Sequence, residues 1–325
     1  MADAVRQHRV SDGTRLAYEL GGRPDAPTAL LCDGISCDGY VWKHLRPWLE
    51  ERFRILHVHY RGHGRSGIPR DPEAVTLPHL AADMAELLDH LALGPAVAFG
   101  HSMGVQVILE MALRTPEHVQ AGVLLCGSSG RLLDTFKETD LGMRLLPGIR
   151  NFTERYAAEV SSALRRVLPT ELSFRVATWT ELNRELIRRE DFMPYLTHFA
   201  TMPPDLFTRM LHDAASRTAD PWLGRVTQPM LVVAGDRDGF TPSRLSQAMA
   251  DALPCATFVL LEGGSHTAPL EVPERVEGAV ADFIARHGPF VVPRSHEAHR
   301  AQATTRFADA FRRGAPAAAA QSSSS

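Results

Sequence analysis

Short apolar runs alternate with helical segments along much of the chain, and this alternation constrains the possible folds more than any other feature of the sequence. An apolar run at 96–99 is followed by a helical stretch at 105–113 and by a second apolar run at 121–125. Strands that are connected through a helix pair in parallel, and helices then cover both faces of the sheet. The sequence therefore predicts an α/β protein with a mostly parallel central sheet flanked by helices.

The alternation is interrupted once. Residues 131–224 contain long helical stretches and no convincing strand, and the alternation resumes with an apolar run at 230–234. We therefore expect residues 1–130 and 225–290 to form one α/β core, with 131–224 inserted into it as a helical cap. The last stretch, 291–325, ends in an Ala/Ser-rich sequence that cannot bury a core, so a disordered tail is expected there.

The remaining elements are predicted from the same hydrophobic patterns. Further strands are expected at 28–32, 53–58 and 256–261. Helices with apolar residues at helical spacing are expected at 80–91, 243–252 and 274–285.

Composition excludes some classes of function. Lys and Arg number 35 against 38 Asp and Glu, so the chain has no excess of positive charge for generic nucleic-acid binding. No apolar stretch approaches the roughly 18–20 residues that cross a bilayer, and the first ten residues lack the apolar run of a signal peptide. The four cysteines are too few to suggest a disulfide scaffold, and we expect reduced thiols in the cytoplasm.

The strongest motif is Gly100-His-Ser-Met-Gly104, which stands between an expected strand and an expected helix. A serine in a tight turn of this kind projects its hydroxyl out of the sheet, and the flanking glycines let neighbouring backbone pass close by. The motif is the G-x-S-x-G nucleophile elbow, and Ser102 is therefore the candidate nucleophile.

A serine hydroxyl needs a base to take its proton, and the base needs a partner that fixes its tautomer. His266 follows an expected strand in a Gly-rich loop, and both Asp236 and Asp238 follow the strand before it. Loops at the carboxyl edge of the sheet can present these side chains, so His266 is the candidate base and one of the two aspartates its partner.

These motifs, together with Arg61-Gly-His-Gly-Arg-Ser-Gly67, resemble the α/β-hydrolase fold family, and in particular its capped, cofactor-independent serine hydrolases. The resemblance covers roughly residues 10–287, and the chain order Ser, Asp, His is that of the family. The family's acid stands fourth in a G-x-x-D stretch, which implies Asp238 with Asp236 as the second choice. The resemblance thus implies a triad of Ser102, Asp238 and His266, and no cofactor.

The resemblance also implies two backbone donors for the oxyanion, the N–H groups of Met103 and Ile35. Asp33 departs from the family pattern, because relatives usually carry His at this position. An ionised Asp33 close to the oxyanion would oppose its formation, whereas a carboxylate turned outward would hold the loop by accepting backbone N–H bonds. We favour the second interpretation.

A metal site is an alternative at the neighbouring strand end. His57 and His59 point to the same face of a regular strand, and relatives commonly carry Asp in place of His59. Other possible ligands nearby are Cys32, Asp33, Cys37 and Asp38. The spacings Cys-x4-Cys and His-x-His, without a second close pair, do not match a structural zinc pattern, so we expect core sulfurs, strand-end histidines and no metal.

The expected cap is rich in aromatic side chains suited to an acyl or ring-bearing substrate, although most of them should form its own core. His101, Trp179 and Phe207 are the candidate substrate-binding residues.

The sequence predicts a serine hydrolase that cleaves a small to medium carboxylic ester or related acyl substrate. One alternative is hydrolysis of a carbon–carbon bond in a diketone-like substrate by the same triad, and another is a cofactor-free perhydrolase activity. A third is a non-enzymatic, ligand-binding protein with little turnover. The expected partner is a small molecule, with no nucleic acid and no membrane span.

Overall fold

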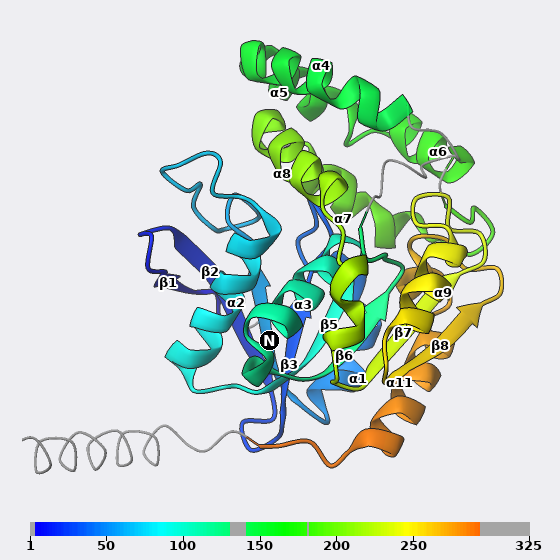
Figure 1. Ribbon diagram of the computed structural model, residues 1–325. Helices are drawn as coiled ribbons and strands as arrows, with labels where there is room; N and C mark the ends of the chain where they lie inside the picture. Colours follow the sequence, from blue (N-terminus) through cyan, green and yellow to red (C-terminus); the bar gives the residue numbers. More distant parts are fainter. Residues whose placement is uncertain (1–3, 131–140, 181, 293–325) are drawn as a thin grey trace, which may run out of the picture.

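The computed structural model of the chain describes residues 4–130, 141–180 and 182–292 (Figure 1). Its centre is a sheet with the strand order β1-β2-β4-β3-β5-β6-β7-β8, and this sheet contains all the strands of the described residues. The strands are β1 (Arg6–Arg9), β2 (Arg15–Gly22), β3 (Thr28–Cys32), β4 (Arg54–His59), β5 (Ala96–His101), β6 (Val119–Leu125), β7 (Met230–Gly235) and β8 (Ala256–Leu261). From β4 to β8 neighbouring strands run parallel, whereas β1 and β2 are added antiparallel at one edge. The predicted α/β class with a mostly parallel sheet is confirmed.

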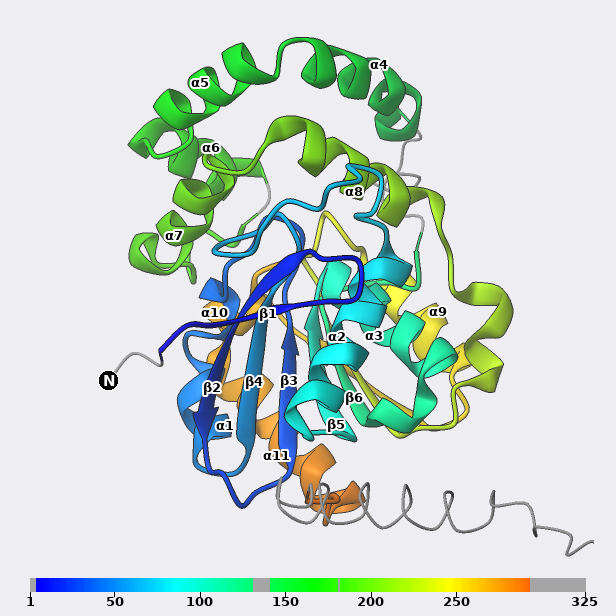
Figure 2. The same ribbon diagram turned by 90° about the vertical axis from the view of Figure 1, so that its left-hand side faces the viewer.

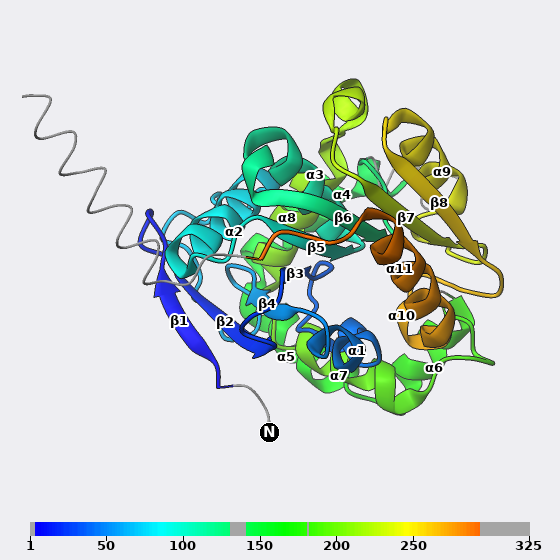
Figure 3. The same cartoon turned by 90° about the horizontal axis from the view of Figure 1, so that it is seen from below.

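Helices cover both faces of the sheet because side chains of successive strand residues point to opposite faces. One face packs against α2 (Leu77–Leu91), α3 (Met103–Arg114) and α9 (Ser243–Ala252). The other packs against α1 (Leu45–Glu50) and α11 (Pro273–His287), with the short α10 (Ala268–Glu271) before it (Figure 3). In β5, for example, Ala96 and Ala98 belong to the first core and Val97 and Phe99 to the second.

The segment between β6 and β7 is helical, as expected of an insertion. It contains α4 (Leu141–Arg155), α5 (Ala157–Val167), α6 (Glu171–Thr180), α7 (Arg189–Phe199) and α8 (Pro204–Ser216). Figure 2 shows α4 and α5 farther from the sheet than α8. We call residues 141–180 and 182–224 the cap. The first ten residues of the expected cap, 131–140, lie outside the described residues, and so does most of the expected tail, 293–325.

Short 3-10 turns complete the described chain. They are Tyr40–Trp42, Pro116–His118 and Asp220–Arg225. All four cysteines are free, and Cys255 is the exposed one. Among the described residues, no helix is both long enough and apolar enough to span a membrane.

Candidate active site

The turn between β5 and α3 carries Ser102 in a backbone conformation that few non-glycine residues adopt, with φ 55° and ψ −117°. The flanking glycines make this turn possible. A Cβ atom on Gly104 would lie 2.1 Å from the carbonyl oxygen of Cys32, and one on Gly100 would lie 2.6 Å from the carbonyl oxygen of Gly104. The start of α3 therefore packs directly against the end of β3, which fixes the position of Ser102 at the carboxyl edge of the sheet.

Three side chains meet at this edge through two hydrogen bonds. His266 Nε2 lies 2.9 Å from Ser102 Oγ, and His266 Nδ1 lies 3.0 Å from Asp238 Oδ2. Ser102 follows β5, while Asp238 and His266 follow β7 and β8, so parallel pairing of β5 to β8 brings the three loops together. The structure thus places the three predicted residues in the serine–base–acid arrangement that activates a serine.

Asp238 is buried, with its side chain 0% exposed, and its carboxylate is held by several donors. Its Oδ1 accepts the backbone N–H groups of Phe240 and Thr241, and its Oδ2 accepts the Thr241 hydroxyl at 2.6 Å. Burial alone would raise the pKa of Asp238, but the charge of His266 and the hydrogen bonds from His266 and Thr241 hold the pKa below its usual value. Asp238 is therefore ionised when it contacts the imidazole.

Asp236, the second choice for the acid, lies on the surface instead. Its Oδ1 accepts the backbone N–H of Gly263, at the start of the loop that leads to His266. The Asp236 carboxylate helps to hold this loop, whereas the hydrogen bond to the His266 imidazole comes from Asp238.

The loop after β3 passes beside Ser102. A Cβ on Gly34 would lie 3.2 Å from Ser102 Cβ and 3.2 Å from His101 Nδ1, so the Gly34 backbone is in contact distance of both side chains. Ile35, the next residue, is partly buried, and Met103 is the first residue of α3. The backbone N–H groups of Ile35 and Met103 remain the predicted oxyanion donors.

Asp33 is buried, and its carboxylate is fully engaged within its own loop and the adjoining strand. Its Oδ2 accepts the Gly39 N–H at 2.8 Å and contacts His57 Nε2 at 3.0 Å, and its Oδ1 accepts the Trp42 indole N–H at 2.6 Å. These contacts agree with the outward interpretation, in which Asp33 holds the loop together.

His101 is a core histidine. It is 1% exposed, and its Nε2–H donates to the backbone carbonyl of His266 at 2.8 Å. Burial, together with a smaller contribution from the neighbouring His266, lowers the pKa of His101 to about 4. A neutral His101 therefore braces the His266 loop, while a role in substrate binding stays a prediction.

The two aromatic residues proposed for substrate binding occupy different environments. Phe207 on α8 is partly buried and packs against Phe199, with ring centroids 4.7 Å apart, and against the core on the α3 face. Trp179 on α6 is 83% exposed and lines a pocket of about 350 Å³ together with Arg237 and Ser265. This pocket lies next to the Asp238 and His266 loops, but Ser102 is not among its lining residues.

Sequence reasoning missed residues that support the site from a distance. Glu271 on α10 is buried and accepts the backbone N–H of Ser265, the Ser265 hydroxyl and the backbone N–H of Asn183 in the cap. It thereby ties the His266 loop to the cap. His63 accepts the N–H of Ser36, next to Ile35, through Nε2 at 3.0 Å. The sequence carries no local signal for either contact.

Comparisons with known proteins agree with the fold. The family model described as alpha/beta hydrolase fold matches residues 27–273. The provisionally named carbamate hydrolase RutD of Stutzerimonas stutzeri is 28% identical over 82% of this chain and 96% of its own length. The uncharacterized hydrolase YugF of Bacillus subtilis is 26% identical over 84% of this chain and 95% of its own length.

Solved structures give the same fold. A thermophilic esterase from Thermogutta terrifontis superposes with a TM-score of 0.69 at 24% identity, covering 88% of this chain and 100% of its own. The enol-lactonase from Burkholderia xenovorans LB400 superposes with a TM-score of 0.71 at 22% identity, covering 86% of this chain and 100% of its own.

The sheet, the inserted helices and the serine turn are those of an alpha/beta hydrolase fold. Because the family model matches well over half of its length, the chain belongs to the α/β hydrolase fold family. This confirms the family that the motifs indicated, and the predicted enzyme class, a hydrolase, is confirmed with it.

Proposed function

We propose that the protein is a serine hydrolase that cleaves a small to medium carboxylic ester or a related acyl substrate through an acyl-enzyme intermediate. The observation that carries the proposal is the continuous hydrogen-bonded chain from Ser102 Oγ through His266 to a buried, ionised Asp238. The relatives provisionally named carbamate hydrolases support adding carbamates to the acyl substrates to be tested.

In the first half of the reaction, Ser102 Oγ attacks the carbonyl carbon of the substrate while His266 Nε2 takes the hydroxyl proton. The N–H groups of Ile35 and Met103 stabilise the oxyanion, a contribution of about 10²- to 10³-fold in rate for each donor. The carbon–oxygen bond to the leaving group then breaks, and His266 returns the proton to that group. Asp238 orients the imidazole and stabilises its charged form throughout.

In the second half, water attacks the acyl-enzyme and gives up a proton to His266. The acid is released as the bond to Ser102 Oγ breaks and the serine recovers its proton. Every proton passes through one imidazole nitrogen, Nε2, and this requires the tautomer that Asp238 holds at Nδ1.

Active-site labelling tests the proposal without knowledge of the substrate. A fluorophosphonate probe should add one label to folded wild-type protein, detected by intact mass, and none to Ser102→Ala. Heat-unfolded wild type, the control for activation by the fold, should stay unlabelled. Turnover of an ester and carbamate panel should fall by at least about 10³-fold in Ser102→Ala, as when a nucleophile is removed from a triad. Equal labelling of Ser102→Ala, or a folded wild type without label or turnover, would refute the proposal.

A further inference from the structure

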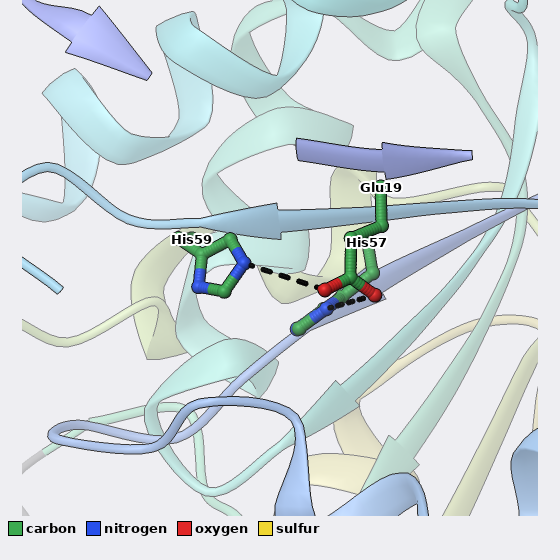
Figure 4. Close-up of side chains that lie close together, drawn as sticks. All are labelled: Glu19, His57 and His59. Carbon is green, nitrogen blue, oxygen red and sulfur yellow. Dashed lines mark ion pairs between the residues drawn. The ribbon is translucent and has the colours of Figure 1, made fainter. Parts of the chain in front are cut away.

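Two strands at the antiparallel edge of the sheet bring three possible metal ligands together. His57 and His59 stand two residues apart on β4, so their rings lie on the same face, with centroids 5.2 Å apart. Glu19 on β2 is paired with His57 in the antiparallel register, directly across the ladder. Figure 4 shows the Glu19 carboxylate between the two rings.

The facing atoms lie at ion-pair distance, beyond the length of a hydrogen bond. His57 Nδ1 lies 3.9 Å from Glu19 Oε2, and His59 Nε2 lies 3.8 Å from Glu19 Oε1. Both distances are too long for hydrogen bonds. The two histidines are 2% and 4% exposed, yet these two ring nitrogens have no hydrogen-bond partner. Buried polar atoms without a partner are rare and call for an explanation such as an ion.

The opposite ring nitrogens each contact a second carboxylate. His57 Nε2 lies 3.0 Å from Asp33 Oδ2, and His59 Nδ1 lies 2.5 Å from Asp38 Oδ1. A histidine that binds a metal through one nitrogen typically donates its other N–H to a carboxylate, which fixes the tautomer and the orientation of the ring. His57 therefore already has the outer hydrogen bond of a metal ligand, whereas His59 has only an ion-pair contact with Asp38 at that nitrogen.

We propose that Glu19, His57 and His59 bind one divalent transition-metal ion of the Zn²⁺ type. Two imidazoles and one carboxylate are donors that suit Zn²⁺, and three protein ligands leave a fourth position for water. The three donor atoms lie within 4.8 Å of one another. Donors around a tetrahedral Zn²⁺ lie about 3.4 Å apart for bonds of about 2.1 Å. Binding thus requires the most widely spaced of these atoms to approach one another by up to about 1.4 Å.

Neighbouring positive charge opposes a cation here and shapes the proposal. Burial would lower the pKa values of His57 and His59, but the surrounding carboxylates raise both, so a metal must displace a proton from each ring. Arg46 donates to Glu19 Oε2 at 2.9 Å and also to Glu50 Oε1 at 2.7 Å. We assign Glu19 Oε1, which faces His59, as the ligand atom, so Arg46 can keep its bond to Oε2. Spacing along the chain did not predict a metal here, because the third ligand, Glu19, belongs to a different strand.

The proposed ion would be linked to the loop beside Ser102. His57 contacts Asp33, and Asp33 holds the loop through Gly39 and Trp42. Metal binding would fix the His57 ring and, through it, the Asp33 contacts of the loop that continues into Gly34. The site lies outside the Ser102 chemistry and takes no part in the proposed acyl transfer.

Direct metal binding to the full chain tests the proposal. Protein stripped with a chelator is titrated with ZnCl₂ by calorimetry and by competition with a chromophoric chelator. Wild type should bind one equivalent, and Co²⁺ should give the visible absorption bands of a four-coordinate site. Glu19→Gln and His59→Asn should each weaken Zn²⁺ binding by at least about tenfold. Even the loss of an outer partner of a metal ligand typically weakens binding by about that factor, and these variants remove a ligand itself.

The matched control is Glu50→Gln, because Glu50 is the other acceptor of Arg46 and lies outside the proposed ligand set. It should bind Zn²⁺ as wild type does, and circular dichroism should show that every variant is folded. If His59→Asn is unfolded, the Zn²⁺ affinity of Glu19→Gln alone decides the test. The proposal is overturned if wild type binds no stoichiometric metal, or if Glu19→Gln binds as tightly as wild type. Labelling at Ser102 is unaffected by either result, so the two proposals fail separately.

Discussion

At the residue scale, the hydrogen bond between Asp238 and His266 Nδ1 decides the tautomer of the proposed base. Asp238→Asn keeps the shape of the side chain but favours the wrong tautomer, so we expect kcat to fall by about 10³- to 10⁴-fold. Folding should persist. Steady-state kinetics on the most active ester of the panel measure this loss.

The matched variant is Asp236→Asn, at the exposed neighbour that accepts the Gly263 N–H. An amide oxygen can still accept that bond, so kcat should stay within roughly threefold of wild type, as for most surface substitutions. A larger loss in Asp236→Asn than in Asp238→Asn would reverse the assignment of the acid.

His101 gives a prediction on pH and stability. Its pKa is lowered from 6.5 to about 4 by burial in the folded protein. The unfolded chain therefore binds the proton first as the pH falls, and stability is lost between about pH 6.5 and pH 4. The shift corresponds to roughly 3 kcal/mol. Urea unfolding across this range should show that the stability difference between wild type and His101→Gln shrinks as the pH falls.

Measurements at pH 8 provide the reference, because they lie above the titration window. The comparison must be made as a difference between the two proteins, since burial also lowers the pKa of His63 to about 4. A stability difference that stays constant from pH 8 to pH 4 would contradict a neutral, buried His101.

At the element scale, the close packing of α3 against β3 makes Gly104 the most sensitive position of the serine turn. A Cβ there would overlap the Cys32 carbonyl, so Gly104→Ala should destabilise the fold by about 3 kcal/mol or more. Gly278 in α11 has open space around its Cβ position. Gly278→Ala should stabilise the protein by about 0.5–1 kcal/mol. Thermal unfolding of both variants distinguishes a packing requirement from a general effect of alanine.

A second prediction at this scale concerns α10. Glu271 accepts bonds from Ser265 and Asn183, and Gln would place an N–H donor where a buried donor already points. We expect Glu271→Gln to cost about 1–3 kcal/mol, the penalty of an unsatisfied buried group. The exposed Glu274→Gln, at the start of α11, is the control and should change stability by about 0.5 kcal/mol or less. Urea unfolding of both checks this, and equal stability of the two variants would contradict the role of Glu271.

Elements were predictable where turn residues bracket an apolar pattern. The expected ranges 28–32, 243–252 and 256–261 match β3, α9 and β8, and each follows a proline or a residue next to one. The strand β1 had no such signal, because Arg6–Arg9 is mostly exposed and is held by backbone pairing with β2. Edge strands of this kind bury too little apolar surface to show a hydrophobic pattern.

At the scale of the whole molecule, the site was predictable only where chain order and strand ends determine it. Ser102, Asp238 and His266 each follow a strand, so parallel pairing alone brings them to one edge. The Glu271 contacts and the position of Glu19 beside His57 depend on side chains that are distant in sequence. Their packing leaves no local pattern, and only the folded structure shows it.

The arrangement of the cap predicts unequal stability across the molecule. In α5 no side chain is buried, and large apolar side chains on α4 to α6 are exposed, among them Phe152 and Leu172. Every residue of β5 is buried between helices. Regions with few buried contacts open more easily. We therefore expect amide hydrogens of α4 to α6 to exchange at least about 100-fold faster than those of β5.

Hydrogen exchange followed by mass spectrometry measures this order, with β5 as the internal reference. Repeating the experiment at tenfold lower protein concentration controls for association of two chains. If two chains covered each other's exposed apolar side chains, the protection of α4 to α6 would depend on the concentration. Protection of α4 to α6 equal to that of β5 at both concentrations would contradict the prediction, because it would require buried contacts that the packing of these helices does not provide. Fast exchange confined to α4 to α6 would instead mean that the outer cap opens while the sheet edge carrying Ser102 stays intact.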